Sequence, residues 1–172
     1  MDNFAEQLVR KQPNSSDNFK RVVTFVGGIV VTILLVVLAF INLGNILCFL
    51  GLVLAAGSGY GTYFLVEGMY VEYEYTFTNG ELDIDKIIAK KKRSELVTAE
   101  VRKFTAFGKY TDNMEESDDM TVVISSDNIA SHEYYADFDH KEYGKTRLIF
   151  SPNEKMLENI KKTLPRNLRN QL

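Results

Sequence analysis

Residues 22–41 read VVTFVGGIVVTILLVVLAFI, and residues 46–66 read ILCFLGLVLAAGSGYGTYFLV. Neither stretch holds a charged side chain, although the chain of 172 residues carries 20 lysines and arginines and 23 aspartates and glutamates. A helix of twenty residues is about 30 Å long, which matches the hydrocarbon core of a bilayer. The Asn-Leu-Gly-Asn sequence at 42–45 favours a tight turn. We therefore expect two antiparallel transmembrane helices, at 22–41 and 46–66.

A soluble core hairpin and a signal peptide fit the apolar block less well. The helices of a soluble core hairpin need polar positions that face water, and this block has almost none. A cleavable signal peptide has an apolar region of about 7–15 residues that is followed by a cleavage site of small residues. Here the first apolar stretch is longer, and a second one follows it directly.

The basic residues outside the two spans predict their orientation. The connecting turn carries no charge, and the nearest basic side chains on either side are Arg10, Lys11, Lys20, Arg21, Lys86, Lys90, Lys91, Lys92 and Arg93. Cytoplasmic flanks of membrane spans carry an excess of lysine and arginine. We therefore expect a multi-pass protein of the inner (cytoplasmic) membrane with both termini in the cytoplasm.

Gly57 and Gly61 lie one helical turn apart in the second span. Small residues at this spacing let a neighbouring helix approach closely. We expect helix packing at these two glycines, either against the first span or, in a homo-oligomer, against another copy of the chain. A phosphate-binding loop fits less well, because no Lys-Ser/Thr pair follows the glycines.

Residues 1–21 are expected to form a cytoplasmic segment. Phe4, Leu8 and Val9 have helical spacing and Pro13 follows them, so we expect a short helix that lies on the membrane or on the rest of the protein. Such a helix is too short to be stable by itself.

Residues 67–172 are expected to form one cytoplasmic domain made mainly of short antiparallel strands. Apolar and polar side chains alternate from Val71 to Thr78, which predicts a half-buried strand, and Asn79-Gly80 predicts a type I′ hairpin turn before a return strand. Further strands are expected at 96–101, 120–125, 133–138 and 146–150. The segment from Phe104 to Asp119 shows no regular pattern.

A final amphipathic helix is expected to cover an open end of the bent sheet. Ser151-Pro152-Asn153-Glu154 matches a capping box with proline at the first helical position. One face of the helix then carries Met156, Leu157, Ile160 and Leu164. Pro165 is expected to end it.

Three stretches resemble a known family: YEYTFTNGELDIDKI at 73–87, SELVTAEV at 94–101 and LIFSPNEKMLENIKKTLP at 148–165. They look like parts of bacterial pleckstrin-homology-like (PH-like) domains attached to membrane spans, a family of small proteins with no assigned function. The resemblance covers about residues 19–165. It implies an α+β membrane protein in which a transmembrane helical hairpin precedes a PH-like antiparallel β-barrel or bent sheet, capped by a C-terminal α-helix. Its motifs describe a fold and identify no active site.

By analogy, such domains bind peptides, proteins or lipid headgroups. Lipid-binding relatives usually carry basic residues in the first loop, and residues 78–81 have none. The basic run Lys90, Lys91, Lys92 and Arg93 lies in the second connection and is a candidate for contact with anionic headgroups, where each basic residue contributes about 1 kcal/mol. The alternative is a solvated hairpin tip that adds to the orientation signal.

No pattern of residues predicts catalysis, a cofactor or a metal. His132, Asp137, Asp139 and His140 have no zinc-site spacing, and residues 115–119 lack the alternation and glycine of a calcium loop. No nucleophile–base pair is recognisable. Nucleic acid is a poor partner because the domain is net negative and has no basic-aromatic stripe.

These features favour a membrane-anchored, non-catalytic interaction or scaffold module. The expected partners are the lipid bilayer and a membrane or cytoplasmic protein, and the ten acidic residues within 112–142 favour a basic one. Two alternatives remain: an accessory subunit of a membrane transporter or channel, and a binder of anionic lipid headgroups. Neither span carries an ionisable residue, the usual mark of a substrate path.

Overall fold

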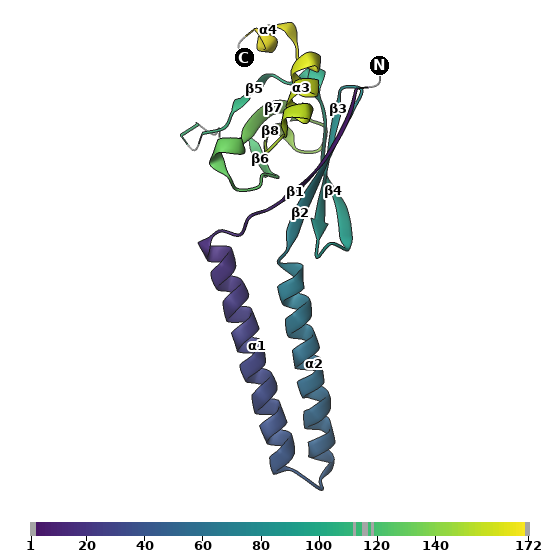
Figure 1. The fold of residues 1–172 in the computed structure, drawn as a ribbon, viewed down its shortest axis with the longest axis vertical. Helices are drawn as coiled ribbons and strands as arrows, with labels where there is room; N and C mark the ends of the chain where they lie inside the picture. The colour runs from purple at the N-terminus through teal and green to yellow at the C-terminus, as the bar shows by residue number, and fades with distance from the viewer. Residues whose placement is uncertain (1–2, 112, 115–116, 118, 171–172) are drawn as a thin grey trace. The chain divides into compact units, whose positions relative to one another are not determined.

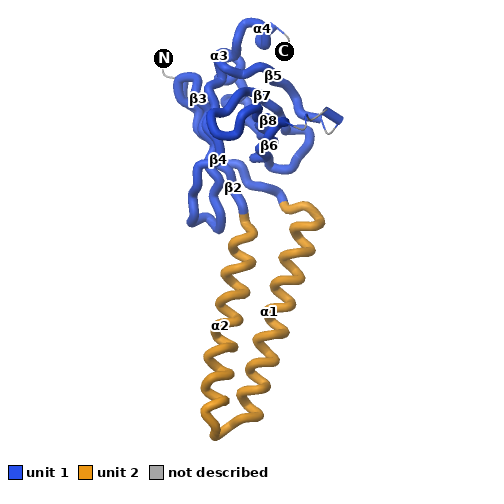
Figure 2. The backbone as a smooth tube through the Cα atoms, turned by 180° about the vertical axis from the view of Figure 1, so that it is seen from behind, with its two compact units in different colours: residues 1–12, 71–172 blue, residues 13–70 orange. Residues whose placement is uncertain are grey.

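The computed structural model describes residues 3–170 except 112, 115, 116 and 118. The chain forms two compact units (Figure 2). One comprises residues 1–12 and 71–172, and the other comprises residues 13–70. The second unit is a helical hairpin and the first contains all the strands, as Figure 1 shows.

The hairpin consists of α1 (Ser15–Ile41) and α2 (Ile46–Gly68). The α1 helix begins seven residues before the predicted span, because Asn14 caps it by accepting a hydrogen bond from the backbone N–H of Asp17 at 2.7 Å. Only Ala39 and Ala55 are buried in the two helices. Both helices are long and apolar enough to cross a membrane, and the exposure of their apolar side chains is unlike that of core helices in a soluble protein.

Sheet A contains β1 (Phe4–Arg10), β2 (Val71–Thr78), β3 (Glu81–Ile88) and β4 (Lys92–Glu100), in that order and all antiparallel. The predicted N-terminal helix is therefore wrong. Its residues form β1, which pairs with β2 from Phe4 opposite Thr78 to Arg10 opposite Glu72. The helical hairpin is thus inserted between two neighbouring strands of one sheet.

Sheet B has the strand order β5-β7-β8-β6. Its strands are β5 (Ala106–Lys109), β6 (Thr121–Ile124), β7 (Tyr134–His140) and β8 (Gly144–Phe150). The expectation of one antiparallel β-barrel or bent sheet needs correction. The described strands form two separate sheets with no closed barrel between them, and β6 runs parallel to β8. The β5 strand lies in the segment whose residues show no regular pattern.

One hydrophobic core unites the two sheets with α3 (Glu154–Thr163). The core includes Tyr75 and Phe77 from sheet A, Phe150 from sheet B, and Met156 and Ile160 from α3. This burial confirms the predicted apolar face of the final helix. The helix ends before Pro165, as the sequence predicted, and a short helix, α4 (Arg166–Arg169), follows.

The predicted capping box is wrong by two residues. Asn153, not Ser151, is the N-cap of α3, and its side chain accepts a hydrogen bond from the backbone N–H of Met156 at 2.8 Å. The hydroxyl of Ser151 instead donates to Asp127 at 2.8 Å. The side chain of Ser151 therefore bonds to a distant residue, Asp127, and does not cap the helix that follows it.

Candidate functional site

Both connections to the helical hairpin leave sheet A at the same end. The β1 strand finishes there at Arg10, and β2 begins there at Val71. The backbone N–H of Lys11 donates to the carbonyl of Val71 at 3.2 Å, which extends the pairing one residue towards the hairpin. Val71 also pairs with Ile88, so the turn between β3 and β4 lies at this end as well.

This end of sheet A collects basic side chains from three segments, and we call it the basic end. Its members are Arg10, Lys11, Lys90, Lys91, Lys92 and Arg93. The sequence identified the last four. Arg10 and Lys11 were missed as part of the cluster, because they were assigned to a separate N-terminal segment and only strand pairing brings them here.

Acidic neighbours hold the two arginines of the basic end. Arg10 lies 3.0 Å from Glu72, and Arg93 forms ion pairs with Glu74 and Asp85. The hydrogen bond with Asp85 is the main cause of a raised pKa for Arg93. Lys92 and Arg93 belong to β4 rather than to the connection in which the sequence placed them. The side chains of Lys90 and Lys92 are exposed at the tip.

The turn at the basic end has an unfavourable backbone conformation. Ala89 and Lys90 have φ angles of 54° and 56°, and the N–H of Lys91 closes the turn on the carbonyl of Ile88 at 3.1 Å. The turn between β2 and β3 has the same left-handed pattern with the favourable residues Asn79 and Gly80. A residue with a Cβ in this region costs about 1–2 kcal/mol more than glycine.

A polar cluster centred on Asp127 holds the backbone of Gln12, three residues before α1 begins. Its backbone carbonyl accepts from the N–H of Gln12 at 3.0 Å, and Asn128 donates to the carbonyl of Gln12 at 2.8 Å. The Asp127 carboxylate accepts from Ser151 and lies 3.1 Å from His132. Partial burial alone would raise the pKa of Asp127, but hydrogen bonds from His132, Ser151 and a backbone N–H outweigh it and lower the pKa.

Serine, aspartate and histidine meet in this cluster, but their order does not suit nucleophilic catalysis. A catalytic triad needs histidine between serine and aspartate, so that the imidazole can take the hydroxyl proton. Here Asp127 lies between Ser151 and His132, and Ser151 is buried. The cluster therefore acts as a structural anchor.

Asp137 and His140, from the set that lacks zinc-site spacing, have other partners in the structure. Asp137 forms a two-bond ion pair with the buried Arg147, with both N–O distances at 2.7 Å, and His140 stacks on Tyr143. Among the described residues, no group of three or more His, Cys, Asp or Glu side chains is placed to hold a metal ion. Of the acidic stretch 115–119, residues 115, 116 and 118 lie outside the described part, and Asp119 pairs with Lys145 at 2.6 Å.

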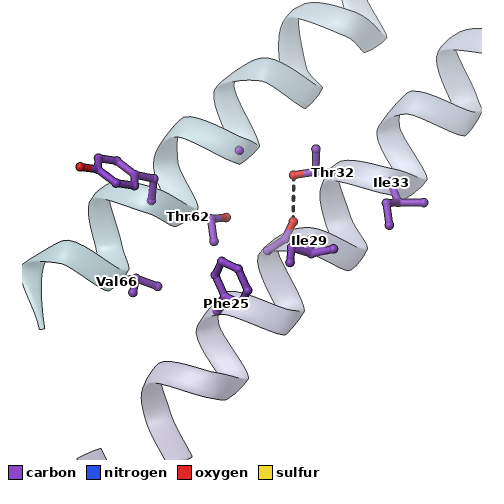
Figure 3. A pocket seen from close by; sticks show the side chains of 9 residues that line it. Phe25, Ile29, Thr32, Ile33, Thr62 and Val66 are labelled. Atoms are coloured by element: carbon purple, nitrogen blue, oxygen red, sulfur yellow. Dashed lines mark hydrogen bonds between the residues drawn. The ribbon is translucent and has the colours of Figure 1, made fainter. Parts of the chain in front are cut away.

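An apolar groove of about 270 Å³ lies between α1 and α2 (Figure 3). Phe25, Ile29 and Val66 line it together with Thr32 and Thr62. Each threonine hydroxyl donates to a carbonyl of its own helix at 2.8 Å, so neither is available as an unpaired donor. The groove thus has the character of helix packing rather than of a polar substrate site.

The helices approach each other through glycines other than those predicted. A Cβ at Gly28 would overlap the side chain of Thr62, and one at Gly51 would lie 2.9 Å from the Cβ of Ala39. A Cβ at Gly57 or Gly61 would meet no atom within 4 Å. The predicted packing of these two glycines against the first span is therefore not found, and their packing against another copy stays a prediction.

Comparison with protein families finds a match for almost the whole chain. A family model described as "Bacterial PH-like domain (DUF6106)" matches residues 1–170. The match confirms the resemblance read from the strands and the final helix, and it also covers β1 and the helical hairpin. No curated protein and no solved structure matches the chain. PH-like domains are in general non-catalytic modules.

Proposed function

The chain belongs to the bacterial PH-like domain family, and from this premise we propose that it is a membrane-anchored, non-catalytic interaction module. The pairing of β1 with β2 is the observation that carries the proposal. Paired antiparallel strands hold opposite Cα atoms about 4.5–5.5 Å apart, so the segments that enter and leave the hairpin start from one place on the domain. Two membrane crossings satisfy this constraint, because the second crossing returns the chain to the side where the first began.

The surface of the hairpin supports insertion in a bilayer. Phe25, Leu34, Phe49 and Leu54 are among many large apolar side chains on α1 and α2 that are at least half exposed. Soluble monomers rarely expose a continuous apolar surface beyond a few hundred Å². A hydrocarbon environment removes the cost of that exposure.

We place the domain on the cytoplasmic side of the inner membrane. Lys20 and Arg21 lie at the start of α1, and the basic end of sheet A adds further positive charge near both connections, whereas the turn at 42–45 has none. Cytoplasmic loops of membrane proteins carry this excess. Anchoring keeps the domain near other membrane proteins and so raises its effective concentration for a protein partner.

Membrane placement is tested with single-cysteine variants in spheroplasts, in a Cys48→Ala background. A membrane-impermeant maleimide is expected to label Asn42→Cys in the connecting turn from outside. Thr78→Cys in the domain should react only after permeabilisation. Labelling of both sites from outside, or of neither before permeabilisation, contradicts the proposed topology.

The interaction role is tested by exchanging the hairpin. Crosslinking and mass spectrometry on native membranes first identify the neighbours of the intact protein. If the domain is the interaction module, replacing α1 and α2 with an unrelated two-span hairpin keeps the same crosslinked partners. Loss of those partners would favour the alternative of an accessory subunit that acts through its spans.

A further inference from the structure

We propose that the basic end of sheet A binds the anionic phospholipid surface of the membrane that the hairpin spans, and that this contact fixes how the domain stands on the bilayer. The inference rests on the proposed function, because only an inserted hairpin keeps this end of the sheet beside the lipid.

Strand register gathers the charge that the proposal needs. Arg10 and Lys11 come from before the hairpin, whereas the cations of the β3–β4 turn come from after it. Ion pairs with Glu72, Glu74 and Asp85 hold Arg10 and Arg93 in place, and the exposed Lys90 and Lys92 extend the positive surface at the tip. The arginines of the basic end are therefore fixed by ion pairs, and its exposed lysines are available to an anionic surface.

Short connections confine this end of the sheet. The α2 helix ends at Gly68 and β2 begins at Val71, so three peptide steps separate them and span at most about 11 Å. The headgroup region on each side of a bilayer is about 5–8 Å thick. A domain joined to a spanning helix in this way keeps its basic end within reach of lipid phosphates.

The β3–β4 turn gives an independent reason to assign a role to Lys90. Asn79-Gly80 shows that this sheet uses the favourable residues for a left-handed turn at its other end. At the basic end, Ala89 and Lys90 take the same conformation at a greater cost. Lysine in place of glycine adds a charged side chain at the exposed tip, where it can meet an anionic surface.

The arrangement suits a lipid surface better than a single headgroup. Lysines act as flexible point charges that need no rigid pocket, and the side chains of Lys90 and Lys92 are exposed. Polybasic clusters of this kind are attracted to the negative surface potential of the inner leaflet. An acidic protein is the competing occupant, and fluorescence quenching in nanodiscs separates the two.

The test uses the full chain with Cys48→Ala in lipid nanodiscs of phosphatidylcholine, with or without about a third of phosphatidylglycerol. A fluorophore on Ser94→Cys reports the basic end, and one on Thr78→Cys reports the opposite end of sheet A. Lipids with a spin label on the headgroup quench whichever fluorophore lies at the surface. We expect Ser94 quenching to rise with phosphatidylglycerol and to fall in high salt, with a smaller response at Thr78.

Charge removal then tests the lysines. Each lysine is expected to change the ratio of docked to undocked domain about fivefold, so Lys90→Gln/Lys92→Gln should lower it more than tenfold. Lys141→Gln/Lys155→Gln removes the same charge elsewhere on the domain and should leave quenching unchanged. Ala89→Asn/Lys90→Gly guards against misfolding, because it installs a favourable turn and should still weaken docking.

The outcomes separate this inference from the proposed function. Failure of the chain to enter nanodiscs overturns both. Entry with equal Ser94 quenching in the two lipid compositions, or with quenching that Lys90→Gln/Lys92→Gln does not alter, overturns the lipid contact alone. Quenching that an added acidic polypeptide abolishes at physiological salt, while phosphatidylglycerol has no effect, assigns the basic end to a protein instead.

Discussion

Single glycines determine how closely α1 and α2 approach each other. Gly28 leaves the space that Thr62 occupies, and Gly51 leaves the space beside Ala39. Gly27 is the neighbour of Gly28 in the same helix, and a Cβ there would meet no atom within 4 Å. The requirement for glycine therefore comes from the interface and not from the helix.

This contrast predicts opposite effects for two adjacent substitutions. Gly28→Ala is expected to destabilise the helical hairpin by about 1–3 kcal/mol, because its methyl group overlaps Thr62. Gly27→Ala should leave stability unchanged or raise it, because alanine favours helix. Unfolding of the purified protein in mixed micelles with increasing dodecyl sulfate, followed by circular dichroism, measures both. Equal effects would show that the helices do not pack at Gly28.

The Asp127 carboxylate predicts a loss of stability in acid. Its folded-state pKa lies below the ordinary aspartate value of about 3.9, so the ionised form stabilises the fold above that value. The stabilisation is lost as the pH falls through the folded-state pKa. Asp127→Asn should cost about 1–3 kcal/mol near neutral pH and flatten the fall in acid. Urea unfolding of the full chain in detergent, at a series of pH values, checks this.

Asp119 provides the matched control for Asp127. Hydrogen bonds from Lys145 and Ser117 lower the pKa of Asp119 to about 2, yet its carboxylate is exposed. Water screens such a pair, so its net contribution to stability is small. Asp119→Asn should therefore leave the unfolding midpoint almost unchanged. A larger loss from Asp119→Asn than from Asp127→Asn would mean that burial is not what makes Asp127 important.

At the scale of elements, β1 shows why a local pattern misled. Phe4, Leu8 and Val9 fit helical spacing, but the strand buries Ala5 and Val9 and leaves Phe4 and Leu8 half exposed. The partner that decides the matter is β2, more than sixty residues later in the chain. No window of sequence around β1 contains that information.

The strand assignment predicts different costs at neighbouring positions. Val9→Gln should destabilise the domain by about 2–4 kcal/mol, because it removes core contacts and buries an amide. Leu8→Gln should change stability by less than about 0.5 kcal/mol, because Leu8 is half exposed. Urea unfolding monitored by tyrosine circular dichroism compares them. Similar losses at both positions would favour the helix over the strand.

Other elements divide in the same way between local and distant causes. The β2–β3 hairpin was predictable because Asn79-Gly80 and the alternation around it act within a few residues. The position of Arg10 and Lys11 in the candidate site was not predictable from the sequence, because it depends on the pairing of β1 with the distant strand β2. The start of α3 was misplaced because Ser151 bonds to Asp127, a residue of a distant loop.

For the whole molecule, insertion of the hairpin into sheet A ties both ends of the hairpin to neighbouring strands. The apolar stretches predicted the two helices, but nothing in them indicated that β1 and β2 would pair across the insertion. The Asp127 cluster adds a second restraint on the same connection through Gln12.

The architecture predicts that a tight turn can replace the hairpin. Lys11 and Val71 are hydrogen-bonded neighbours at 3.2 Å, which is the geometry that closes a two-residue turn. A shortened chain in which Asn-Gly joins Lys11 to Val71 should fold as a PH-like domain in water without detergent. Hydrogen exchange is expected to show protected amides in both β1 and β2. The same chain without β1 should unfold or aggregate, because the core at Ala5 and Val9 is then open.

This pair of shortened chains tests the fold and the anchor together. If both are equally well folded, β1 is not part of the domain, and the proposal of two membrane crossings loses the strand pairing that supports it. If the intact protein is also monodisperse without detergent, the hairpin is not a membrane anchor. A hairpin inserted in sheet A requires a different result: only the shortened chain that keeps β1 folds, and the intact protein needs detergent. In that case the removal of residues 12–70 removes the apolar surface and leaves β1 paired with β2.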